Sequence, residues 1–80
     1  MTPAQLRAAR HLLGLSQAEV AERAGLSVPT VKRVESERDV PVSEDAIHAV
    51  RTALEAAGVQ FIEQNGGGPG VRLRRSKPTS

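Results

Sequence analysis

The side chains that could carry out chemistry are few in this sequence of 80 residues, and they do not group into a reactive site. The sequence contains no cysteine, which excludes disulfides, thiolate metal sites and cysteine nucleophiles. His11 and His48 have no further ligand at metal-site spacing, and the glutamates form no acid–base couple. The glycine-rich run at 66–70 lacks the helix and the lysine of a phosphate-binding loop. We therefore expect no catalytic residues, no metal, no cofactor and no enzymatic activity.

The informative segment is instead residues 17–36, where the pattern predicts two short helices joined by a tight turn. Gly25 lies where the turn needs a positive φ, which costs a residue with a Cβ atom about 1–2 kcal/mol. Ala21 must be small because the second helix passes over it. The apolar residues expected to lock the two helices are Val20, Ala24, Leu26, Val31 and Val34. The residues left pointing outward from the second helix are Val28, Pro29, Thr30, Lys32, Arg33 and Ser36.

Four helices are expected in all, because a hydroxyl residue that can cap a helix precedes each apolar stripe. They are expected over residues 3–13, 17–24, 28–36 and 44–57. The caps are Thr2, Ser16, Ser27 and Ser43, and the glycines that stop a helix are Gly14, Gly25 and Gly58. The inward stripes of the first and last helices are Leu6, Ala9 and Leu13, then Ile47, Val50 and Leu54.

The last part of the chain changes in character. Val59–Ile62 and Val71–Arg74 are short β-type runs, and the segment between them is rich in turn residues. This pattern predicts a β-hairpin, which is only marginally stable alone and must pack on the helices or on a second copy. Residues 75–80 are expected to be disordered.

Charge is divided unevenly along the chain. The segment 1–65 contains seven basic and nine acidic residues. In the segment 66–80 all charged residues are basic: Arg72, Arg74, Arg75 and Lys77. This basic tail has three interpretations: an arm on DNA phosphates or in the minor groove, a solubilising strand edge, or a contact for an acidic partner.

Residues 3–57 resemble the Xre/Cro-type helix-turn-helix family, which has the lambda-repressor-like fold. The most specific part is the run GLSQAEVAERAGLS at 14–27, and Thr30, Val31 and Glu35 also match. The resemblance implies an all-α bundle of four or five helices, here with a small C-terminal β-hairpin. It also implies that the helix after Gly25 binds the major groove of double-stranded DNA, usually in a dimer.

The resemblance further implies roles for single residues. Arg33 matches a position that reaches base edges, where arginine can pair with guanine O6 and N7. Val28 could touch a thymine methyl. The residues expected to contact the DNA backbone are Gln17, Ser27, Thr30 and Lys32. The full set of expected DNA-binding residues is Gln17, Ser27, Val28, Pro29, Thr30, Lys32, Arg33 and Arg38. Arg10 and Glu35 match a pair that many relatives join in an internal salt bridge.

Two positions depart from the family pattern. Glu37 stands where relatives often have glycine, which affects how the third helix ends and where Arg38 points. Val28 and Pro29 replace the more usual polar residues, so few direct hydrogen bonds to bases are expected.

These inferences predict a sequence-specific DNA-binding transcriptional regulator, most simply a dimeric repressor of a palindromic site. Residues 1–58 would form the DNA-binding domain, 59–74 the dimerising hairpin and 75–80 the basic tail. The residues expected at the homodimer interface are Phe61, Ile62, Val71 and Leu73. Two recognition helices would then enter successive major grooves roughly 34 Å apart.

Location and partners complete the set of expectations. Arg7 and Arg10 interrupt the apolar residues of the N-terminus, so neither a signal peptide nor a membrane contact is expected, and the protein is expected in the cytoplasm. The alternative function is a protein-interaction module, such as an antitoxin or an antagonist of another regulator, whose protein partner would bind the hairpin.

Overall fold

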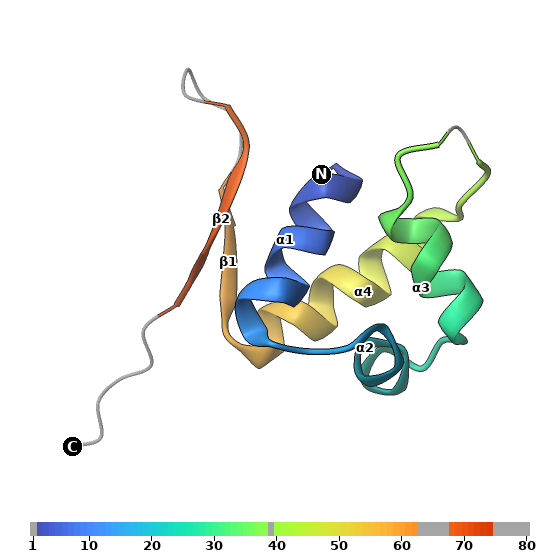
Figure 1. The fold of residues 1–80 in the computed structure, drawn as a ribbon, viewed down its shortest axis with the longest axis horizontal. Helices are drawn as coiled ribbons and strands as arrows, with labels where there is room; N and C mark the ends of the chain where they lie inside the picture. Colours follow the sequence, from blue (N-terminus) through green and yellow to red (C-terminus); the bar gives the residue numbers. More distant parts are fainter. Residues whose placement is uncertain (1, 39, 63–67, 75–80) are drawn as a thin grey trace.

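The computed structural model describes residues 2–38, 40–62 and 68–74. Four helices are followed by an antiparallel hairpin (Figure 1): α1 Pro3–Leu13, α2 Gln17–Ala24, α3 Val28–Glu35, α4 Glu44–Ala57, β1 Val59–Ile62 and β2 Gly70–Leu73. The predicted fold class is confirmed. Two elements differ from the prediction: α3 ends one residue earlier, at Glu35, and β2 is shifted by one residue, to 70–73.

Local signals account for where the helices begin and end. Each of the four hydroxyl residues predicted as a cap accepts a hydrogen bond from the backbone N–H three residues later. Full capping boxes form at α1 and α2, through Gln5 and Glu19. Gly14 and Gly25 end these two helices with φ of 68° and 72°, a conformation that disfavours residues with a Cβ atom.

The core is almost entirely aliphatic and is shared by all four helices and the hairpin. Its buried members are Leu6, Ala9, Val20, Ala21, Val31, Val34, Ala46, Val50, Leu54, Val59 and Phe61. Leu13, Ala24 and Ile47, also predicted inward, are half-buried against it. None of the helices in the described part of the chain is both long and apolar enough to cross a membrane.

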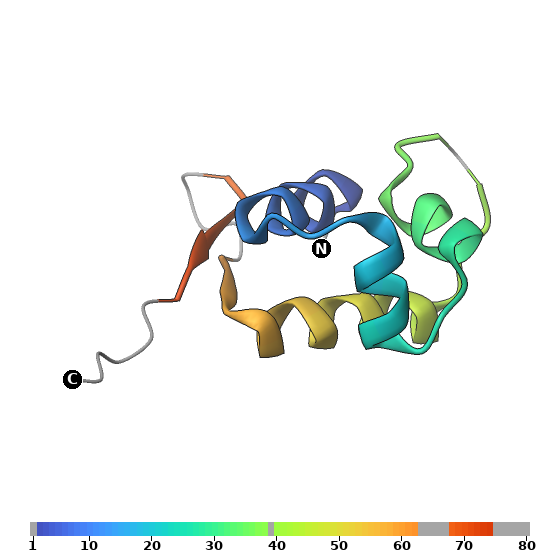
Figure 2. The same ribbon diagram turned by 60° about the horizontal axis from the view of Figure 1, so that its bottom comes forward.

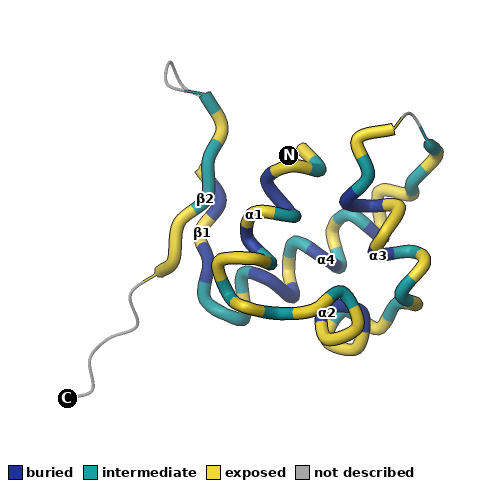
Figure 3. Tube along the Cα trace, in the orientation of Figure 1, coloured by how far each residue is buried: buried dark blue, intermediate teal, exposed yellow. Residues whose placement is uncertain are grey.

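The hairpin packs on α1 and α4 through one face. Val59 and Phe61 of β1 are buried, and their partners across the ladder are Leu73 and Val71 (Figure 3). The buried Gln5 side chain of α1 donates through Nε2 to the carbonyl oxygens of Gly70 (3.0 Å) and Ile62 (3.4 Å). The hairpin is therefore fastened to the helices by a polar contact as well as by apolar packing.

The hairpin and α3 lie at opposite ends of the bundle, as two views agree (Figures 1 and 2). The alternation predicted for the second strand does not give alternating burial, because Leu73 is 53% exposed although it pairs with buried Val59. The disorder expected for residues 75–80 falls outside the described residues.

Candidate nucleic-acid interface

The turn between α2 and α3 has the tight geometry that the sequence predicted. After α2, the Leu26 N–H donates to the Ala21 carbonyl oxygen at 2.9 Å, which closes the turn around left-handed Gly25. The Leu26 side chain packs against the core, and Ala21 is buried. The two helices therefore cross closely, and α3 keeps one face toward the core and the other toward solvent (Figure 2).

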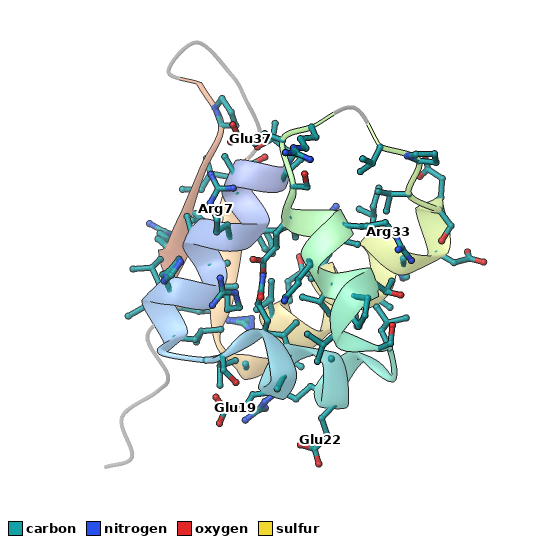
Figure 4. The ribbon with its side chains drawn as sticks, turned by 45° about the vertical axis from the view of Figure 1, so that its right-hand side comes forward. Arg7, Glu19, Glu22, Arg33 and Glu37 are labelled. Atoms are coloured by element: carbon teal, nitrogen blue, oxygen red, sulfur yellow. The ribbon has the colours of Figure 1, made fainter. Side chains whose placement is uncertain are left out.

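Five of the eight residues predicted to bind DNA belong to α3, and three of them are exposed on its outer face. Pro29, Lys32 and Arg33 are exposed, and Figure 4 shows Arg33 on the side of α3 opposite to α1. Val28 is half-buried and packs against the core, so little of its surface faces outward. Thr30 is half-buried as well.

Two residues that were predicted to contact the DNA backbone bond to each other at the N-terminal cap of α3. The hydroxyl oxygens of Ser27 and Thr30 lie 2.8 Å apart, and the Thr30 N–H donates to Ser27 Oγ. A phosphate offers only acceptor atoms, so it needs a proton from one of these hydroxyls. One of their two protons is used in the hydrogen bond between them. The other remains available to a phosphate. Arg38 is exposed beyond the end of α3, and its N–H donates to Ser36 Oγ at 3.0 Å.

The inner side of α3 ends in a buried ionic contact. Glu35 is only 3% exposed, and Arg10 of α1 donates to both of its carboxylate oxygens, at 2.7 and 3.0 Å. The salt bridge implied by the family resemblance is therefore present. Arg10 also donates to the Leu15 carbonyl oxygen at 3.1 Å. Such a bidentate salt bridge fixes the orientation of the two side chains as well as the distance between them.

Gln17 joins this contact, which sequence reasoning missed. Its Nε2 donates to Glu35 Oε1 at 3.1 Å, and its side chain is half-buried. An amide nitrogen carries two protons, so the second is available to a phosphate. The predicted phosphate contact of Gln17 stays a prediction, and the structure adds that Glu35 orients the amide that would make it.

Arg7 is a second residue that sequence reasoning missed. Its Nη1 donates to the Glu35 carbonyl oxygen at 3.0 Å, and its Nη2 pairs with Glu37 Oε2 at 3.0 Å. Figure 4 shows Arg7 and Glu37 facing each other between α1 and the segment after α3. The available signal was the spacing of Arg7 and Arg10, which places both on one side of α1, one turn apart.

Three exposed basic residues lie on α3 or just after it. Lys32, Arg33 and Arg38 take part in none of the salt bridges between described residues. At the start of α2, the pKa of the Glu19 carboxyl is lowered. The larger cause is the hydrogen bond that it accepts from the Ser16 backbone N–H, and the second is hydrogen bonding with the Ser16 side chain. A carboxylate there stabilises the helix dipole but opposes a phosphate beside it.

The four residues predicted at a dimer interface differ in how far they are exposed to solvent. Phe61 is 8% exposed and faces the core of its own chain, so it has little surface to offer a second copy. Ile62 and Leu73 are 37% and 53% exposed, and Val71 is half-buried. Leu12 of α1, which sequence reasoning did not single out, is 45% exposed.

Two of the basic residues in segment 66–80 belong to the hairpin. Arg72 donates to Gln60 Oε1 at 3.1 Å, and Arg74 donates to the Glu55 carbonyl oxygen at 3.3 Å. Arg72 lies in β2 and Arg74 directly follows it, and the hairpin is at the end of the bundle away from α3 (Figures 1 and 2). Arg75 and Lys77 lie outside the described residues.

The chain has two short helices joined by a glycine turn, and the second helix has a buried face and an exposed, basic face. This arrangement defines a helix-turn-helix protein. The family described as "Helix-turn-helix domain" matches residues 4–61. The chain therefore belongs to this family, in the lambda-repressor-like class, and is a helix-turn-helix DNA-binding domain. No curated protein matches the sequence significantly. No group of three potential metal ligands occurs among the residues that the structure describes.

Proposed function

We propose that this protein is a sequence-specific transcriptional regulator in the cytoplasm that inserts α3 into the major groove of double-stranded DNA, and that it acts as a binding protein rather than an enzyme. The observation that carries the proposal is the division of α3 into two faces. Val31, Val34 and Glu35 are buried, while Lys32 and Arg33 are exposed. A helix held along one side and basic on the other has the form that reads base edges in a groove.

The roles of the exposed residues follow from their chemistry. Arg33 is assigned to a guanine, whose O6 and N7 accept its two parallel donors. Lys32 and Arg38 are assigned to phosphates, and the second amide proton of Gln17 to a third. Because Val28 is half-buried, its contact with a thymine methyl is expected to be minor. Shape and deformability of the DNA would then contribute much of the sequence preference.

Salt dependence tests whether phosphates provide the affinity. If about six phosphates are neutralised, the affinity for a duplex is expected to fall roughly a thousandfold between 50 and 200 mM salt. Fluorescence anisotropy with a labelled duplex measures this directly. Binding that does not change with salt, and that does not distinguish between duplex sequences, would refute the proposal.

The proposal includes a homodimer on a palindromic site, with a repressor as its simplest action. Leu73 is exposed on the face of the hairpin that carries Val59, Ile62 is exposed on its other face, and Leu12 of α1 is also exposed. Burying such residues against a second copy would stabilise a domain with a thin core. Because the hairpin is at the end away from α3, a dimer joined there would separate the two α3 helices widely. We therefore expect half-sites about two DNA turns apart rather than one turn of about 34 Å.

A charge placed on the hairpin tests this interface. Leu73→Asp is expected to convert the dimer to a monomer and to weaken binding to a two-half-site duplex at least tenfold, since each copy then binds alone. Sedimentation velocity gives the oligomeric state, and Lys32→Asp, on the opposite end, should leave it dimeric. A wild-type chain that sediments as a monomer at all concentrations would contradict the dimer but not DNA binding.

The alternative function uses the same exposed residues. Leu12 and Leu73 also suit a different protein, and the chain would then be an antitoxin or an antagonist that docks through its hairpin. A partner that copurifies with the wild type, is lost with Leu73→Asp and is kept with Arg33→Ala would favour this alternative.

A further inference from the structure

The C-terminal end of α3 differs from those of the other three described helices. Helices α1, α2 and α4 end at glycines with positive φ, and the N–H of each glycine bonds to carbonyl oxygens in the last turn. Helix α3 ends instead at Ser36, with an extended backbone of φ −79° and ψ 139°. The Ser36 N–H bonds to the Arg33 carbonyl oxygen. The carbonyl of Glu35, the last helical residue, has no partner within the helix, as at the end of any α-helix.

Arg7 provides a partner for this carbonyl oxygen. Its guanidinium donates to the Glu35 carbonyl oxygen and, two residues further on, to the Glu37 carboxylate, both at 3.0 Å. One side chain of α1 therefore contacts the chain immediately before and immediately after the point where it leaves α3. A guanidinium is planar and rigid, so two such contacts fix the direction of the chain that they join.

We propose that Arg7 is a positioning residue for DNA recognition, which sets the end of α3 and the course of the segment carrying Arg38. This inference rests on the proposed function, and it assigns Arg7 no contact with DNA. The Arg7 and Glu37 side chains are 41% and 60% exposed, and an exposed ion pair contributes little to stability. The effect of removing it is therefore expected in binding rather than in folding.

The test compares Arg7→Met, Glu37→Gln and the double variant in binding to a duplex that the wild type prefers. Arg7→Met is expected to weaken binding about fivefold, within the range for residues that share one network. The slope of log affinity against log salt should fall by no more than it does in Arg38→Ala, because the phosphate contact that depends on Arg7 is that of Arg38. Glu37→Gln is also expected to weaken binding, although removing an acid would by electrostatics alone strengthen it. The double variant should bind about as Arg7→Met does.

The chain offers a matched control pair. Arg51 and Glu55 on α4 form a salt bridge of 3.1 Å with side chains 38% and 40% exposed. Arg51→Met and Glu55→Gln are expected to leave DNA affinity unchanged. The proposal is overturned if Glu37→Gln strengthens binding, if the control pair has the same effect, or if Arg7→Met still lowers the slope of log affinity against log salt when Arg38 has been replaced by alanine, since Arg7 would then contact a phosphate itself.

A second readout needs no DNA. In NMR spectra of the free protein, Arg7→Met is expected to shift the amide signals of residues 35–38, while Arg51→Met leaves them in place. If these signals do not move, Arg7 does not position the segment, even where the wild type binds DNA. If they move but no duplex sequence is preferred, Arg7 positions the segment and the proposed function is wrong.

Discussion

Replacing Arg10 with methionine is expected to lower the free energy of unfolding by about 3–5 kcal/mol, the usual cost of removing one partner of a buried ion pair. Glu35 is 3% exposed and receives two hydrogen bonds from Arg10. Without them its carboxylate would stay buried with only the Gln17 amide beside it. Small domains are stable by about 5–15 kcal/mol in total, so this single change removes a large part of the stability.

Urea unfolding followed by circular dichroism measures the effect. Arg51→Met, which breaks an exposed salt bridge, is the control and is expected to cost no more than about 1 kcal/mol. The double variant Arg10→Met/Glu35→Leu should regain much of the loss, because an apolar pair leaves no buried charge. A loss for Arg10→Met as small as that of the control would mean that Glu35 is not buried in solution.

Replacing Arg33 with alanine is expected to remove about 1–3 kcal/mol of discrimination at one base pair of each half-site. Arg33 is exposed and lies outside the core, so the free energy of unfolding should stay within about 0.5 kcal/mol of the wild type. The measurement is anisotropy with a set of duplexes that differ by single base pairs.

Lys32→Ala is the matched control for Arg33, because Lys32 is an exposed neighbour on the same helix. A phosphate ligand gives no sequence information, so Lys32→Ala should weaken all duplexes alike and lower the salt slope by about 1 for each copy bound. If Arg33→Ala behaves in the same way, Arg33 contacts the backbone rather than a base. If it has no effect on any duplex, α3 does not read DNA through this residue.

The features predicted correctly are those set by residues close together in the sequence. A hydroxyl cap, a glycine at the end of α1 or α2, and the spacing of Val31 and Val34 each act within one or two helical turns. These signals were enough to place all four helices and the crossing of α2 over α3.

The features that sequence reasoning missed depend on contacts between distant segments. Gln5 and Arg7 bond to residues 65 and 30 positions away, respectively, and nothing near them in the sequence marks those partners. Phe61 was expected on a dimer surface as part of the apolar surface of the hairpin. The alternation of that strand fixes which residues share a face but not which face is covered, and the helices of the same chain cover Phe61.

The selection of bound duplexes from random DNA tests the central claim most directly, since it asks whether the exposed face of α3 distinguishes one sequence from another. With the wild-type protein at physiological salt, we expect repeated rounds to enrich a short motif containing a guanine, present twice in inverted orientation. Recovery of duplexes with no more sequence bias than the starting pool would contradict it.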